Sequence, residues 1–157
     1  MDYKIREIKE SEYSVLSDFL YEAIFIPKGM EKPPKSIIEQ SELQVYIADF
    51  GKADDWCWVA EVKEKIVGAV WVRIMNDYGH IDDETPSLAI SLYDEYRSLG
   101  IGTALMEAML QFLKDKGYKK TSLSVQKANY AVTMYRKIGF KVVSETEEEY
   151  IMVCELQ

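Results

Sequence analysis

An arginine and two glycines, spaced Arg97-x-x-Gly100-x-Gly102, separate an apolar run from a long amphipathic stretch. The apolar run (residues 88–93) predicts a strand, and the periodic stretch that ends at Gly117 predicts a helix. A helix that starts directly after a glycine turn presents unpaired backbone N–H groups and the positive end of its dipole. Together with the charge of Arg97, these groups predict a binding site for a phosphate or pyrophosphate, although the glycines could equally serve packing alone.

Two common phosphate-binding sequences do not fit this turn. No Gly-Lys-Ser/Thr follows the glycines, so a Walker A loop is not predicted. The order G-x-G-x-x-G does not occur either, which excludes the dinucleotide-binding fingerprint. The turn therefore predicts another class of anion site.

A second motif follows the next predicted strand (residues 119–126). Its sequence is Asn129-Tyr-Ala-Val-Thr-Met-Tyr135, and Gly139 and Phe140 come shortly after it. Asn129 is a good N-cap for a helix, and Gly139 stands where a helix C-cap glycine is expected. Tyr135 lies on the apolar stripe of this helix, so roles in the core and in catalysis are both open.

The two motifs, in this order and separated by one helix and one strand, resemble those of the GNAT N-acetyltransferases, and the resemblance covers most of the chain. The glycine turn is similar to the family's acetyl-CoA signature, and the stretch around Tyr135 is similar to its second motif. The resemblance implies an α/β (α+β) fold, with a mixed, mostly antiparallel sheet of about six to seven strands flanked by four helices. Strands four and five of that sheet are parallel and splayed. It also implies transfer of an acetyl group from acetyl-CoA to a primary amine of a small molecule, peptide or protein.

The resemblance assigns roles to residues of both motifs. Acetyl-CoA is expected between strands 88–93 and 119–126, with its pantetheine amides paired to the first strand and its pyrophosphate on the turn. Tyr135 is expected to be the general acid that protonates the sulfur of CoA. Arg97 is expected to pair with the phosphates or only to shape the turn, and Asn129 to contact the cofactor or only to cap its helix. The expected cofactor-binding residues are Ile90, Ser91, Leu92, Arg97, Ser98, Leu99, Gly100, Ile101, Gly102, Thr103 and Asn129.

The sequence offers no clear general base. An amine must be neutral to attack, and a primary amine with a pKa near 10 is neutral in only about one molecule per thousand at pH 7. Some members of the resembled family carry a glutamate on the fifth strand, but Ser124 occupies the matching position. Glu61 and Glu84 are candidates for a base acting through water, with Glu61 also explained as an exposed strand residue. An acceptor that arrives neutral would need no carboxylate.

Composition narrows the partners. The 157 residues predict one domain (1–157), and the net charge of -8 argues against nucleic acid and suits a cationic substrate. The first residues do not resemble a signal peptide and no apolar run reaches membrane-spanning length, so a cytoplasmic protein without a membrane partner is expected. Cys57 and Cys154 are expected to be buried free thiols, and no metal is expected because no metal-ligand spacing occurs. A homodimer through the terminal strand is compatible with the sequence.

The other elements follow from hydrophobic periodicity. Strands are predicted at residues 4–9, 56–63, 66–75, 140–146 and 150–156, and helices from Ser11 and over 41–50. The 24–40 and 76–86 loops and the terminal hairpin are expected to set acceptor specificity. The carboxylates of 77–84 suggest a cationic acceptor such as a polyamine or aminoglycoside, although solvated loop charge explains them as well. Glu145–Glu149 is predicted to be a solvated turn.

Two other functions fit the same residues. A catalytically silent acyl-CoA-binding module, acting as a sensor or partner subunit, would keep the cofactor motif without the chemistry. A nucleotide-phosphate-binding protein would use the same helix start, and would bind ATP without binding CoA. The presence of Arg97, Gly100, Gly102 and Tyr135 together favours the enzyme.

Overall fold

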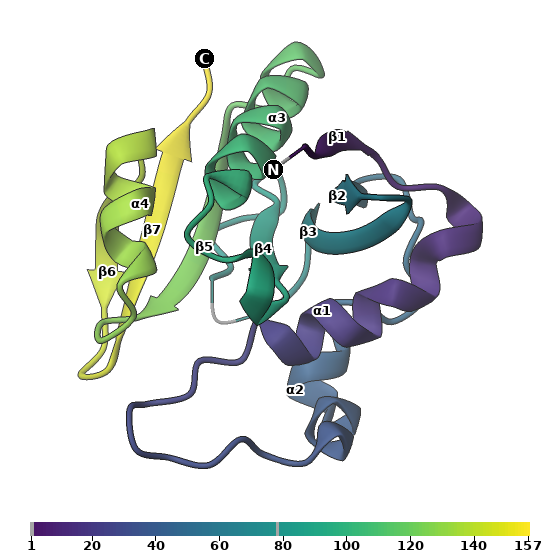
Figure 1. Cartoon of the computed structure of the whole chain (residues 1–157). Helices are drawn as coiled ribbons and strands as arrows, with labels where there is room; N and C mark the ends of the chain where they lie inside the picture. Colours follow the sequence, from purple (N-terminus) through teal and green to yellow (C-terminus); the bar gives the residue numbers. More distant parts are fainter. Residues whose placement is uncertain (1, 78) are drawn as a thin grey trace.

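The computed structural model describes residues 2–77 and 79–157. Within these residues, seven strands form one sheet in the order β1-β2-β3-β4-β5-β7-β6, flanked by four α-helices (Figure 1). The strands are β1 (Lys4–Glu7), β2 (Trp56–Val62), β3 (Lys65–Arg73), β4 (Ser87–Leu92), β5 (Lys120–Gln126), β6 (Lys141–Glu145) and β7 (Glu149–Glu155). The helices are α1 (Leu16–Glu22), α2 (Ser41–Gln44), α3 (Ile101–Asp115) and α4 (Ala131–Ile138), with 3-10 segments at Glu10–Val15, Lys35–Glu39 and Asp94–Tyr96.

β4 and β5 are parallel, whereas the other neighbouring strands of the sheet are antiparallel. Ser87 of β4 pairs with Ser122 of β5, and beyond this pair the two strands separate toward their C-terminal ends (Figure 1). The hairpin of β6 and β7 continues the sheet from the other side of β5. The fold predicted from the sequence, with strands four and five parallel and splayed, is confirmed.

Alternate residues of the central strands supply two cores on opposite faces of the sheet. Val59 and Trp71 belong to the core that α1 covers, and Phe19 of α1 is fully buried there. Val70 belongs to the other core, together with Met109 of α3. Both α1 and α3 also contact β4, one from each face of the sheet.

Glycines mark both ends of α3, as the sequence predicts. Gly100 precedes the helix with a φ of 87° and Gly117 follows it with a φ of 94°, both in the left-handed region that favours glycine. At the C-terminal end, the N–H of Tyr118 donates to the carbonyl of Leu113 at 3.1 Å, as in a Schellman motif. Because Gly100 ends the turn that follows β4, α3 begins directly after that turn.

The predicted cap of the first helix is wrong. Ser11 lies inside a 3-10 segment that begins at Glu10 and continues into α1. The carboxylate of Glu12 accepts a hydrogen bond from the backbone N–H of Lys9 at 2.8 Å. The same carboxylate binds Arg6 of β1, so the start of the segment is fixed by the strand before it.

The helix predicted over residues 41–50 is shorter in the structure, where it ends at Gln44. The following backbone carbonyls bind side chains of the sheet instead of helix N–H groups. The indole N–H of Trp71 donates to the carbonyl of Tyr46 at 3.1 Å, and Arg73 donates to the carbonyls of residues 45 and 48. Periodicity could not predict these bonds, because they come from residues more than twenty positions away.

Cys57 and Cys154 are buried free thiols, as expected. None of the described helices combines the length and the hydropathy that a membrane span requires.

Candidate active site

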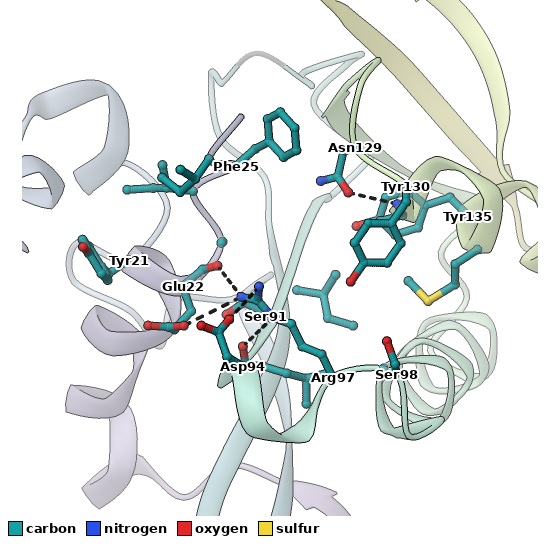
Figure 2. Close-up of a pocket in the computed structure, with 18 of the residues that line it drawn as sticks. Tyr21, Glu22, Phe25, Ser91, Asp94, Arg97, Ser98, Asn129, Tyr130 and Tyr135 are labelled. Carbon is teal, nitrogen blue, oxygen red and sulfur yellow. Dashed lines mark hydrogen bonds and ion pairs between the residues drawn. The ribbon is translucent and has the colours of Figure 1, made fainter. Parts of the chain in front are cut away.

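A cavity of about 500 Å³ lies at the C-terminal end of β4, where β4 and β5 separate (Figure 2). Its walls come from the segment after α1, the end of β4, the glycine turn with the first turn of α3, and the start of α4. The predicted site residues that line it are Ile90, Ser91, Leu92, Arg97, Ser98, Gly100, Gly102, Thr103, Asn129 and Tyr135. The side chains of Leu99, which is 49% exposed, and of Ile101, which is in the core, do not line it.

The first turn of α3 offers free hydrogen-bond donors to this cavity. The backbone N–H groups of Ile101, Gly102 and Thr103 precede the point at which helix carbonyls can accept from them. The N-cap residue, Gly100, has no side chain that could accept in their place. Ser98 adopts a left-handed conformation (φ 61°), which costs energy for a residue other than glycine. The turn therefore presents N–H donors and the positive end of the helix dipole, which suit a phosphate.

Arg97 is held by groups of the protein itself. Its Nη1 lies 2.8 Å from Asp94 Oδ1, and its Nη2 lies 3.7 Å from Glu22 Oε1 and 3.2 Å from the Glu22 carbonyl oxygen. Its Nε donates to the carbonyl of Leu92 at 3.2 Å. These contacts join the turn after β4 to the C-terminal end of α1 (Figure 2). Of the two roles open to Arg97, shaping the turn is the one with direct contacts.

β4 has one paired edge and one open edge. Residues 87–92 pair with β3 in antiparallel register. On the other edge, beyond the Ser87–Ser122 pair, no described strand pairs with β4. The side chain of Ser91 is already used, since its hydroxyl donates to the carbonyl of Phe19 at 2.6 Å. What β4 can offer a ligand in the cavity is therefore its backbone.

Tyr135 projects from α4 and is 8% exposed. Its ring packs against Phe140, with 5.9 Å between the ring centroids. Burial raises the pKa of the Tyr135 hydroxyl to about 12, because the charged phenolate is disfavoured away from water. The phenol therefore keeps its proton at neutral pH and is available as a proton donor.

Asn129 stands two residues before α4. Its Oδ1 accepts a hydrogen bond from the backbone N–H of Ala131, the first residue of α4, at 2.9 Å (Figure 2). Asn129 also lines the cavity. A contact between its amide group and the cofactor stays a prediction.

A second cavity, of about 300 Å³, adjoins the first. The residues that line both are Ala23, Ile24, Phe25, Ile90, Asn129 and Tyr135. The second cavity extends between β4 and β5 to Ser124, Gln126 and Glu149. Tyr135 therefore stands between two cavities, one that reaches the glycine turn and one that reaches a carboxylate.

The predicted solvated turn at 145–149 is wrong for its last residue. Glu149 is the first residue of β7 and is half-buried. It pairs in register with Gln126 of β5, whose Nε2 donates to Glu149 Oε1 at 2.9 Å. Only the order of strands β5, β7 and β6 brings this carboxylate to the cavity, and residue spacing carries no signal of it.

The two carboxylates suggested as bases lie elsewhere. Glu61 pairs with Arg6 at 3.1 Å between β1 and β2, and Glu84 is exposed in the loop before β4. Neither lines one of the two cavities. Tyr130 and Met134 do line the larger cavity, although neither belonged to the predicted site. The two are four residues apart, the spacing of one helix face, and this is the one signal that could have placed them together.

Comparison with known proteins identifies the family. The chain matches the family described as Acetyltransferase (GNAT) domain over residues 15–154. It therefore belongs to the GNAT acetyltransferases, as its two motifs indicate.

Related sequences are N-acetyltransferases of modest identity. The chain is 31% identical to the N-alpha-acetyltransferase of Sulfurisphaera tokodaii over 115 residues, which cover 63% of this chain and 68% of that protein. It is 35% identical to the probable N-acetyltransferase camello of Xenopus tropicalis over 85 residues, which cover 54% of this chain and 37% of that protein. The match to human N-acetyltransferase 8B likewise covers 40% of that protein's length, at 32% identity over 90 residues, or 57% of this chain. The chain thus spans well under half the length of the latter two.

Solved structures show the same fold. The PaiA N-acetyltransferase from Thermoplasma acidophilum, in complex with coenzyme A, superposes with a TM-score of 0.70 at 20% identity, covering 99% of both chains. The ribosomal-protein-S18-alanine N-acetyltransferase from Escherichia coli superposes with a TM-score of 0.70 at 15% identity, covering 99% of this chain and 95% of that one.

Proposed function

We propose that this chain is an acetyl-CoA-dependent N-acetyltransferase that acts on a primary amine. The observation that carries the proposal is the position of Tyr135 between two cavities. The larger cavity ends at an uncapped helix N-terminus and suits a cofactor that carries phosphate groups. The smaller one ends at Glu149 and suits an amine. The coenzyme A bound to the Thermoplasma acidophilum relative of this fold supports acetyl-CoA as the acetyl donor.

The residues of the larger cavity fit such a cofactor. The open edge of β4 at Ile90–Leu92 can pair with the pantetheine amides as an added strand would. The N–H groups of the turn at 98–103 can bind the pyrophosphate, with the Thr103 hydroxyl as a further donor. A Cβ added at Gly102 would lie in the cavity wall, 3.5 Å from Leu92 Cδ1. Because glycine has only a hydrogen in that place, the backbone stays accessible to the cofactor.

In the proposed reaction, the amine nitrogen bonds to the acetyl carbon while the carbon–sulfur bond breaks. The nitrogen loses a proton, and the departing sulfur keeps the bonding electron pair and gains a proton. Tyr135 is proposed to donate that second proton, because its hydroxyl is protonated at neutral pH and the residue lines both cavities. The products are the acetylated amine and CoA with a free thiol.

The test is release of the CoA thiol from acetyl-CoA, measured with a panel of primary amines and with no amine. Thiol release that depends on an amine, with the N-acetylated product identified by mass spectrometry, supports the enzyme. Binding of acetyl-CoA without any amine-dependent release would favour the silent acyl-CoA-binding module instead. One observation favours that alternative, which is that Ser124 stands where some members of the resembled family carry a glutamate.

A further inference from the structure

The smaller cavity has an unusual lining for a site that must take a polar amine. Ten of its lining residues carry apolar side chains, and they come from α1, α2, β4, β5 and the segment after α1. The apolar members are Leu20, Ala23, Ile24, Phe25, Leu43, Leu88, Ala89, Ile90, Leu123 and Val125. Glu149 is the one charged residue among the described residues that line it. Its volume of about 300 Å³ is at the small end for ligand sites, which range over roughly 300–1,000 Å³.

Glu149 has no basic partner within the described chain. Its Oε1 accepts one hydrogen bond, from the neutral amide of Gln126. Lys127, which directly follows β5, is paired with Glu145 at 2.8 Å. No ion pair of the described residues includes Glu149. A half-buried carboxylate without a cation suits a ligand that supplies a positive charge.

The groups around Glu149 are neutral or already paired. Tyr46, which lines the cavity, donates its hydroxyl proton to Asp77 at 2.9 Å, and burial together with Asp77 raises the Tyr46 pKa well above its ordinary value. Tyr135, which lines the same cavity, is also a protonated phenol. Asp77 itself accepts a second hydrogen bond, from Ser87 at 2.8 Å, and does not line the cavity. The acidic stretch that suggested a polyamine or aminoglycoside therefore does not form this site in the described residues.

We infer that Glu149 binds the acceptor's ammonium group and takes its proton, and that the acceptor is a primary amine on an apolar body without a carboxylate. This inference rests on the proposed function. The proton passes from the nitrogen to Glu149 Oε, which leaves a neutral amine to attack the thioester and later releases the proton to water. A carboxylate on the acceptor would enter a cavity whose one charged lining residue, Glu149, is already negative.

The acceptor class is tested with three amines at saturating acetyl-CoA. 2-Phenylethylamine carries its amine on an apolar ring, phenylalanine adds a carboxylate to the same skeleton, and spermidine is a polyamine. We expect kcat/KM to be at least about tenfold higher for 2-phenylethylamine than for either comparator, since one unpaired buried charge costs more than 1.4 kcal/mol. Equal or better activity with spermidine or phenylalanine would overturn the inference.

The role of Glu149 is tested with Glu149→Gln and the matched control Glu148→Gln, which makes the same charge change at an exposed neighbour. For the parent protein, kcat/KM should vary little between pH 7 and 9. The ammonium form of the acceptor binds to the Glu149 carboxylate and passes its proton to it, so no proton has to be lost to the solvent before the reaction. In Glu149→Gln, kcat/KM should fall about 100-fold at pH 7 and rise about tenfold per pH unit, since only free neutral amine then reacts. Glu148→Gln should match the parent.

Other outcomes are also decisive. An unchanged pH profile in Glu149→Gln, or the same change in both variants, would overturn the role of Glu149. If none of the three amines is acetylated, binding of 2-phenylethylamine to the protein loaded with desulfo-CoA is measured by calorimetry in the parent and in Glu149→Gln. Its failure to bind the parent would overturn this inference alone, whereas failure of acetyl-CoA itself to bind would overturn the proposed function.

Discussion

Ser87 and Ser122 form the registered pair that joins the parallel strands β4 and β5, and the strands part beyond it. Both serines are buried and bound, since Ser87 donates to Asp77 at 2.8 Å and Ser122 donates to the Gly79 carbonyl at 2.6 Å. The loop between β3 and β4 thus closes the sheet at one end of the two strands. The other end stays open, and there both cavities and Tyr135 are found.

Tyr135→Phe removes the proposed proton donor without changing the shape of the side chain. We expect kcat to fall about 100-fold, the lower end for loss of a general acid, while the affinity for acetyl-CoA changes less than about threefold. Steady-state kinetics and calorimetric titration measure the two quantities. Unchanged kcat with a good acceptor would remove Tyr135 from the mechanism.

Alanine should have different effects at the two glycines of the turn, lowering cofactor affinity at Gly102 and stability at Gly100. At Gly102, an added methyl group meets only ordinary contacts, so Gly102→Ala should fold normally and gain up to about 1 kcal/mol of helix stability. The methyl would stand in the cavity wall, however, and the affinity for acetyl-CoA should fall at least about tenfold.

Gly100→Ala is the matched control for that variant. A Cβ there meets nothing within 4 Å, but the φ of 87° is strained for alanine, so we expect a loss of about 1–2 kcal/mol in the free energy of unfolding. Chemical denaturation and calorimetry separate the effects. Normal acetyl-CoA affinity in Gly102→Ala would show that the backbone at this position does not approach the cofactor.

Arg97 should act through the shape of the turn and not as a phosphate ligand. A lysine keeps the charge but cannot reach Asp94, Glu22 and the Leu92 carbonyl together, as the planar guanidinium does. Arg97→Lys should therefore lower acetyl-CoA affinity nearly as much as Arg97→Ala, by about tenfold. Retention of parent affinity by the lysine variant alone would point to a direct ion pair with phosphate.

Acid should weaken the anchor of the first 3-10 segment. The guanidinium of Arg6, 2.8 Å from Glu12, lowers the pKa of that carboxyl from 4.5 to about 2. Because the folded state binds this proton more weakly than the unfolded state, the stabilisation is full above pH 4.5 and is lost as pH falls toward 2. The free energy of unfolding of Glu12→Gln should thus approach that of the parent between pH 5 and 2. A constant difference across that range would contradict the ion pair.

The sequence could predict features set by neighbouring residues. The turn at 97–102, the C-terminal glycine Gly117 and the hydrogen bond of Asn129 to the start of α4 each follow from a local conformational need, and each is found in the structure. The family resemblance supplied the splay of β4 and β5, because periodicity gives strands but not their pairing.

The errors concern contacts between distant segments. The helix from Ser41 ends early because Trp71 and Arg73 bind its carbonyls. Glu149 is drawn from a turn into the cavity by its register with Gln126. The end of this helix and the position of Glu149 both depend on which strands are neighbours. The composition of the two segments alone predicts a longer helix and a solvated turn.

Calorimetric titration with acetyl-CoA, desulfo-CoA and ATP shows whether the larger cavity is a cofactor site. We expect acetyl-CoA and desulfo-CoA both to bind in the micromolar range and ATP not to bind, because the turn and the edge of β4 act together. If neither CoA compound binds, the cavity is not a cofactor site, and the glycine turn serves packing alone.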